Sequence, residues 1–244
     1  MEQKLPRHIA VIPDGNRRWA KHFGLTSFTG HLKGRERFHE ISKFAFDLGI
    51  PYFTFWAMSE DNLSKRASAE INGLISLMQE SLCGPMADDL LKNQIRLRVL
   101  GGWKNKSNFD CLAHIIDDLE NKTRLFDKHN LTILLGYNGT TELVEAVQKN
   151  LYFWFLKLTG EPSQPLDFET IRQAAWTSEL PPVDIVIRTG ETQENWSHNS
   201  SGFMMLHATD SETRYSKTLW PNFSEQEFKK IVEEYGKRER KFGK

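Results

Sequence analysis

The chain has 244 residues, of which 32 are basic and 32 acidic, so its formal net charge is zero. This length favours one compact domain, and the balanced charge argues against a general nucleic-acid-binding protein, which normally carries a basic excess. The two cysteines, Cys83 and Cys111, form neither a CxxC pair nor a zinc-binding spacing, so we expect reduced thiols in a cytoplasmic protein. No apolar run reaches the length of a membrane-spanning helix.

In chain order, short apolar runs alternate with longer segments of helical periodicity. Five strands are predicted, at residues 8–12, 52–57, 95–100, 131–135 and 183–188. Helices are predicted from residue 17, over 35–48, 68–91 and 109–127, from residue 141, and over 223–235. Strands that alternate with helices indicate an α/β fold, a single domain over residues 1–244 with a central, mostly parallel sheet flanked by helices.

Three polar clusters follow predicted strands, at residues 14–18, 59–66 and 188–191. Because ligands of such sheets bind beyond the carboxyl ends of the strands, we expect these clusters to converge on one rim. That rim is the predicted functional site.

The first cluster, Asp14-Gly15-Asn16-Arg17-Arg18, suits a diphosphate. Gly15 lets the backbone approach a ligand closely, and Arg17 and Arg18 supply charge-assisted hydrogen-bond donors. A carboxylate repels phosphate, so Asp14 makes sense if Mg²⁺ bridges the two. The alternative is a capped helix with solvated arginines, in an unrelated phosphate-binding α/β protein.

Further blocks make the pattern specific, because they stand in a fixed order over nearly the whole chain. They are His8 with Asp14 to Ala20, Gly30-His31 and Gly34, then Ala57, Ser59 and Asn62, residues 135–139 with Glu142, and residues 184–190, 219–223 and 238–243. With these blocks the chain resembles the cis-prenyltransferases of the undecaprenyl diphosphate synthase type.

The resemblance implies a magnesium-dependent enzyme that condenses an allylic prenyl diphosphate with isopentenyl diphosphate, giving a cis-polyprenyl diphosphate. It implies a homodimer, with residues 203–220 at the interface, and membrane contact through the hydrocarbon product. It also implies an apolar tunnel for the growing chain. Candidates for the tunnel wall are Ile71, Leu74, Ile75, Met78, Phe53 and Phe55, although such a stripe usually fills a core.

Roles for single residues also follow from the resemblance. Asp14 would be catalytic and hold Mg²⁺, with Glu212 as a second metal ligand near the dimer interface. Asn62 would be catalytic, assisting proton removal during condensation. The implied substrate-binding residues are Gly15, Asn16, Arg17, Arg18, Trp19, His31, Ser59, Lys65, Arg188 and Ser201.

Departures from the family pattern concern the diphosphate contacts. Ser27 stands where the family has an arginine, and Lys65 replaces another, keeping the charge without the bidentate fork. Residues 192–200 form a longer segment, which places Asn199 at a second arginine position. We therefore expect weaker binding of isopentenyl diphosphate or a changed second substrate. The open alternatives are a divergent enzyme with another acceptor or an irregular condensation, and a non-catalytic partner subunit of an active homologue.

Overall fold

A computed structural model of the chain describes residues 5–156, 167–191 and 200–237. Six strands in this part form one sheet of order β3-β4-β2-β1-β5-β6, in which every neighbouring pair is parallel. The strands are β1 His8–Ile12, β2 Tyr52–Ser59, β3 Ile95–Leu100, β4 His129–Tyr137, β5 Ile185–Arg188 and β6 Glu212–Tyr215. The predicted α/β fold with a parallel sheet is therefore confirmed, with β6 as an edge strand that the sequence did not predict.

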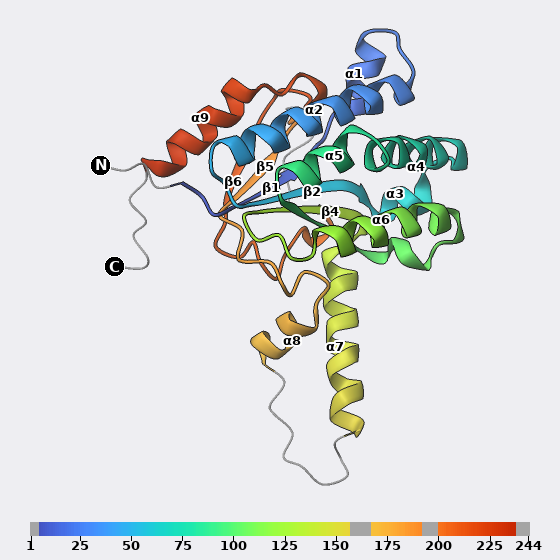
Figure 1. The fold of residues 1–244 in the computed structure, drawn as a ribbon, viewed down its shortest axis with the longest axis vertical. Coiled ribbons are helices and arrows are strands. Elements are labelled where there is room, and N and C mark those ends of the chain that lie inside the picture. The colour runs from blue at the N-terminus through green and yellow to red at the C-terminus, as the bar shows by residue number, and fades with distance from the viewer. Residues whose placement is uncertain (1–4, 157–166, 192–199, 238–244) are drawn as a thin grey trace.

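The α-helices lie mainly over one face of this sheet (Figure 1). They are α1 Asn16–His22, α2 Ser27–Asp47, α3 Glu60–Lys65, α4 Ser68–Leu82, α5 Pro85–Lys92, α6 Asp110–Thr123, α7 Gly139–Leu156, α8 Phe168–Ala174 and α9 Glu225–Gly236. Side chains of α2, α4, α5, α6 and α9 form the main core with β1 to β5. Figure 1 shows α7 and α8 projecting away from the sheet.

The opposite face carries a second, smaller core. Strand β1 is buried on both sides: Ile9 and Val11 face the helices, whereas Ala10 and Ile12 pack in the second core with Phe203. All nine residues of β4 are buried as well. Central strands of a parallel sheet are covered on both faces, which explains their nearly continuous apolar sequence.

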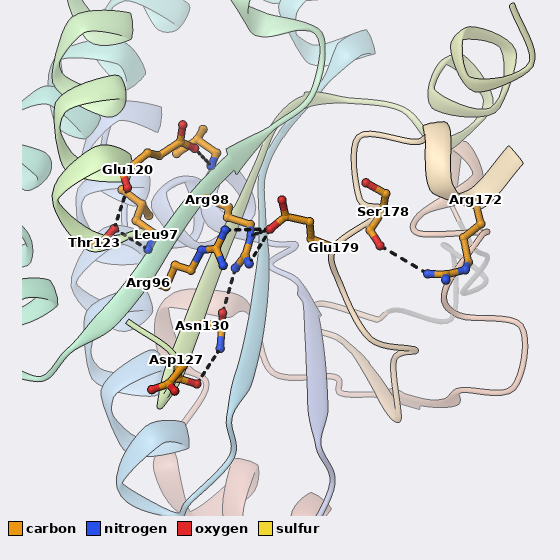
Figure 2. Close-up of polar contacts among 11 residues, drawn as sticks. Arg96, Leu97, Arg98, Glu120, Thr123, Asp127, Asn130, Arg172, Ser178 and Glu179 are labelled. Carbon is orange, nitrogen blue, oxygen red and sulfur yellow. Dashed lines mark hydrogen bonds and ion pairs between the residues drawn. The ribbon is translucent and has the colours of Figure 1, made fainter. Parts of the chain in front are cut away.

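The arginines of β3 hold a loop against the sheet. Arg98 donates to Asn130 Oδ1 at 2.9 Å and to Glu179 Oε2 at 2.9 Å, and Arg96 donates to the same Glu179 oxygen at 2.8 Å (Figure 2). The alternation of arginine with apolar residues in β3 thus has a structural explanation, in which charge-assisted bonds hold the Glu179 loop on the strand.

Two helix boundaries differ from the sequence prediction. The helix predicted over 68–91 is divided at Gly84, because α5 begins with Pro85 at its first position, where a missing N–H costs nothing. Helix α2 begins at Ser27, well before residue 35, and the Thr26 hydroxyl caps it by accepting from Thr29 N. Gly30 and Gly34 lie inside α2 and obscure the helical pattern of its first turns in the sequence.

Candidate active site

The loop between β1 and α1 holds Asp14 at the carboxyl edge of the sheet. Gly15 has φ 116°, and a Cβ there would lie 2.7 Å from Leu219 Cδ2, so only glycine fits. The Asp14 carbonyl accepts hydrogen bonds from Thr189 Oγ1 at 2.9 Å and from Trp220 N at 3.0 Å. Two distant segments, at Thr189 and at Leu219–Trp220, thus fix the backbone that carries this carboxylate.

Two guanidinium groups flank the Asp14 carboxylate, whose side chain is 45% exposed. Arg18 Nη2 lies 3.3 Å from one oxygen and Arg188 Nη2 lies 3.6 Å from the other. Arg18 also donates to Gly190 O at 2.7 Å, and Arg188 to Ser200 Oγ at 2.7 Å. The two guanidinium groups therefore offer positive charge to an anion, while the Asp14 carboxylate stays partly accessible to solvent.

Helix α1 packs closely on α2, which brings Asn16 into the site. A Cβ on Gly34 would lie 2.3 Å from Asn16 Oδ1, and one on Gly30 would lie 2.2 Å from Asn16 O. Both glycines are therefore required by the close approach of the two helices.

A cavity of about 490 Å³ begins at Asp14. Its polar part is lined, from loops at the carboxyl edge and from helices α1, α2 and α3, by Asp14, Asn16, Arg17, His31, Ser59, Asp61, Asn62, Arg66, Arg188, Ser200 and Ser201. Its apolar part lies between the sheet and helices α2, α4 and α5, and is lined by Phe38, Phe55, Leu74, Leu77, Met78, Leu82, Met86 and Ile133. A molecule with an anionic head and a hydrocarbon tail matches both parts.

Most of the site residues expected from the sequence meet at this cavity. Those that line it are Asp14, Asn16, Arg17, His31, Ser59, Asn62, Arg188 and Ser201. Gly15 and Arg18 lie behind them and position Asp14. Trp19 does not line the cavity, and its Nε1 donates to Asn222 Oδ1 at 2.9 Å.

Lys65 is not brought to the cavity, whereas its neighbour Arg66 is. The Lys65 side chain is 73% exposed and its Nζ lies 2.7 Å from Asp61 Oδ2. The Arg66 side chain is only 16% exposed and its Nη1 lies 3.2 Å from Glu70 Oε1. Sequence reasoning missed Arg66, although it stands in the polar cluster at 59–66 beside Lys65, the residue implied by the family resemblance.

Glu70 contacts two side chains that line the cavity, Arg66 and His31. It accepts from Arg66 and lies 3.1 Å from His31 Nε2. Burial lowers the pKa of Arg66, which Glu70 counteracts, and Arg17 lowers it further. Burial is also the main cause that lowers the pKa of His31. Arg66 Nε is buried with no hydrogen-bond partner in the described part of the chain, so it can still receive an acceptor.

Ser59 and Asn62 come from the start of α3. Ser59 caps this helix, since its Oγ accepts from Asn62 N at 3.1 Å. Both residues line the cavity, and the cap fixes the Asn62 backbone beside it.

Glu212 lies at the amino-terminal ends of the strands, opposite to the edge that carries Asp14. It is the first residue of β6 and pairs with Ile185, the first residue of β5, whereas Arg188 at the end of β5 pairs with Tyr215. Three residues of strand, about 10 Å, separate these levels. Glu212 forms an ion pair with Arg214. Because Glu212 lies at the start of the strands and Asp14 follows the end of β1, the two do not meet within one chain.

The donor set at the cavity fits Mg²⁺ bound together with a diphosphate. No cluster of three or more acidic, histidine or cysteine ligands occurs among the residues that the structure describes. Mg²⁺ commonly binds through one or two carboxylates plus substrate phosphates and water. The half-exposed Asp14 carboxylate has the chemistry of such a ligand, and the cations around it match the charge of phosphates.

Only part of the predicted tunnel wall lines the cavity. Leu74, Met78 and Phe55 do so, whereas Ile71, Ile75 and Phe53 belong to the hydrophobic core. Ser27 is an exposed residue at the start of α2. Asn199 and residues 192–199 lie outside the described residues.

A family model described as "Putative undecaprenyl diphosphate synthase" matches residues 12–243. The chain belongs to this family. It is 33% identical over 241 residues to the isoprenyl transferase of Thermotoga maritima, with 98% of this chain and 97% of the relative covered. It is therefore a prenyltransferase, and its membership of this family supports a role in prenyl chain elongation.

Two further relatives of this prenyltransferase have more specific descriptions. The tritrans,polycis-undecaprenyl-diphosphate synthase (geranylgeranyl-diphosphate specific) of Thermoplasma acidophilum is 29% identical, with 98% of this chain and 89% of the relative covered. The structure of lavandulyl diphosphate synthase from Lavandula x intermedia in complex with dimethylallyl diphosphate superposes with a TM-score of 0.87 at 26% identity, covering 98% of this chain and 99% of that one. Among its described helices, the prenyltransferase has none that is long and apolar enough to cross a bilayer.

Proposed function

We propose that this prenyltransferase condenses an allylic prenyl diphosphate with isopentenyl diphosphate, with Mg²⁺, to give a cis-polyprenyl diphosphate. The observation that carries the proposal is the single cavity at Asp14, cationic at the loops and apolar between the sheet and the helices. The diphosphate head suits the first part and the growing hydrocarbon suits the second.

In the proposed reaction a bond forms between C1 of the allylic substrate and C4 of the isopentenyl unit. The allylic C–O bond breaks, diphosphate leaves with the electron pair, and a proton leaves C2 of the isopentenyl unit. Mg²⁺, when bound, supplies positive charge that stabilises the leaving diphosphate.

The chain's own residues bind and orient the two diphosphates. Asn16, Arg17 and Arg66 donate to the allylic diphosphate, and Asp14 beside them is the magnesium ligand. Arg188 and Ser201 bind the isopentenyl diphosphate on the β5 side of the cavity. Preorganised cations of this kind stabilise charge that develops on a leaving group and need no rearrangement during the reaction.

Asn62 is proposed to orient the departing proton. It lines the same cavity as both groups of cations, and the Ser59 cap holds its backbone. Its side-chain amide offers an acceptor oxygen that can hydrogen-bond the proton or a water that carries it away.

A product assay tests the proposed function. The purified protein is incubated with farnesyl diphosphate, isopentenyl diphosphate and Mg²⁺, and product masses are recorded. We expect a series of products that differ by five carbons, reduced by at least a hundredfold in Asp14→Ala and lost with a chelator. A complete absence of five-carbon additions from the folded wild-type protein would overturn the proposal.

A second candidate is an irregular condensation with another acceptor. It is favoured by the similarity to lavandulyl diphosphate synthase bound to dimethylallyl diphosphate, and by Asn199 and Ser27 at expected arginine positions. The same assay with dimethylallyl diphosphate as the sole substrate distinguishes it, because only the second candidate gives a ten-carbon diphosphate there.

A homodimer in the cytoplasm, with Glu212 near the shared interface, remains a prediction. Sedimentation equilibrium of the purified protein measures the first part, and a monomer at micromolar concentration would contradict it.

A further inference from the structure

The turn that joins α1 to α2 is an exposed apolar tip. All eight residues from 21 to 28 are exposed, and three of them are large and apolar: Phe23 at 56%, Leu25 at 45% and Phe28 at 48%. The Phe23 ring also lies 4.9 Å from that of Trp19. Single exposed apolar side chains are ordinary, but several in one small segment mark an interaction surface. We call residues 21–28 the α1–α2 tip.

The shape of the tip is built by hydrogen bonds. Leu25 N donates to Ala20 O at 2.8 Å, and Gly24 provides the left-handed turn with φ 66°. Thr26 then caps α2 by accepting from Thr29 N at 3.3 Å. A held conformation of this kind presents the apolar side chains to solvent as a fixed surface.

Positive charge is concentrated around the tip. Residues 15–35 contain five lysines and arginines and no aspartate or glutamate, although the whole chain is neutral. Three of the five pair with Asp14, Glu36 and Glu80, the first two of which directly flank this stretch. The other two, Arg17 and Lys21, are exposed and have no ion pair within the described part of the chain. Arg17 lines the cavity, so Lys21 is the cation that the tip itself presents. The partner surface that fits is therefore apolar and negatively charged.

The tip is also continuous with the cavity. Helix α1 begins with Asn16 and Arg17, which line the cavity, and its other end leads into the tip. Figure 1 shows α1 and this turn at the outer edge of the molecule. A surface bound at the tip would thus lie one short helix, α1, away from the cavity.

From these observations we propose that the α1–α2 tip docks on an anionic lipid bilayer. Phe23, Leu25 and Phe28 enter the interfacial region, and Lys21 contacts the acidic headgroups. A second copy fits less well, because a symmetric contact would place two basic tips against each other. The inference goes beyond the proposed function: it names the surface by which the enzyme meets the phase that accepts its hydrocarbon product, and docking itself requires no turnover.

Vesicle co-sedimentation without substrates tests the proposal, using the full chain with phosphatidylglycerol-containing vesicles and with pure phosphatidylcholine vesicles. We expect binding that is stronger to the anionic vesicles and weakens with salt. The double variant F23S/L25S should lose at least tenfold in affinity. Lys21→Glu should lose affinity for the anionic vesicles alone.

The matched control is L125S/F168S, which removes one exposed leucine and one exposed phenylalanine far from the tip, 83% and 55% exposed. It should bind vesicles like the wild type. Equal binding by F23S/L25S and the wild type, or no vesicle binding at all, would overturn the proposal. A change of sedimentation coefficient in F23S/L25S, with vesicle binding unaltered, would assign the tip to self-association instead. Because no substrate is present, these outcomes are independent of the product assay.

Discussion

At the scale of single residues, the cation that lines the cavity from the segment between β2 and α4 is Arg66, not Lys65, which the family resemblance implied. Lys65 and Arg66 are adjacent in the sequence, but Lys65 ends α3 and points to solvent, where it pairs with Asp61. Arg66 follows in extended backbone and turns inward to Glu70. One residue of difference in the helix end decides which side chain can reach a phosphate.

We therefore predict that Arg66→Ala raises the KM for the diphosphate substrates about ten- to hundredfold, because a charge-assisted hydrogen bond contributes roughly 1.5–3 kcal/mol. Lys65→Ala is the matched control and should change the KM less than twofold. Steady-state kinetics at fixed Mg²⁺ measures both. The opposite ranking of the two variants would show that the extended segment rearranges when substrate binds.

At the scale of elements, the short helix α5 separates two cavities. Met86, near its start, is 4% exposed and lines both the active-site cavity and a second cavity of about 550 Å³. The second cavity opens at the amino-terminal edge of β3 and β4, and charged residues line it, among them Lys43, Asp89 and Lys128. A hydrocarbon chain gains less by entering a space that charged groups line than by staying in the apolar part of the first cavity. Met86 thus forms the closed end of the apolar part of the active-site cavity.

If the proposed function holds, Met86→Ala should shift the products to greater lengths by one or more five-carbon units, and Met86→Phe should shorten them. Leu90→Ala is the control, because Leu90 is equally buried on α5 but lines only the second cavity. Product masses give the answer, and thermal unfolding checks that the truncation, which costs about 2–5 kcal/mol, leaves the protein folded. Identical product lengths in all three variants would contradict the role of Met86.

At the scale of the whole molecule, the free energy of unfolding depends on pH through two buried histidines, His8 and His207. His8 is fully buried, with Nδ1 2.9 Å from Pro181 O and Nε2 2.8 Å from Thr54 Oγ1. Burial lowers the pKa of His8 to about 4, and burial likewise lowers the pKa of His207 to about 4. Both side chains are therefore neutral in the folded protein at pH values where the unfolded chain already binds protons.

As far as these two histidines are concerned, the free energy of unfolding should be highest above pH 6.5. It should fall as the pH drops towards 4, with no further loss from these two groups below pH 4. Between pH 7 and pH 5 the loss is about 2 kcal/mol per histidine. Denaturant titrations at several pH values measure it. His8→Gln should remove about 2 kcal/mol of the loss between pH 7 and pH 5, and His114→Gln, at an exposed position on α6, is the matched control. A slope unaltered in His8→Gln would contradict the assignment.

The sequence by itself determined the α/β class, five of the six strands and the family, because buried parallel strands are short and apolar and the motif blocks stand in a fixed order. It also brought forward Asp14, Arg17 and Arg188, since residues that follow parallel strands share one edge. Only the tertiary structure decided that Arg66 replaces Lys65 at the cavity, and that Glu212 lies far from Asp14 in the same chain. It alone also showed that Met86 divides two cavities. These facts depend on helix ends, strand register and packing between distant segments, which no local pattern encodes.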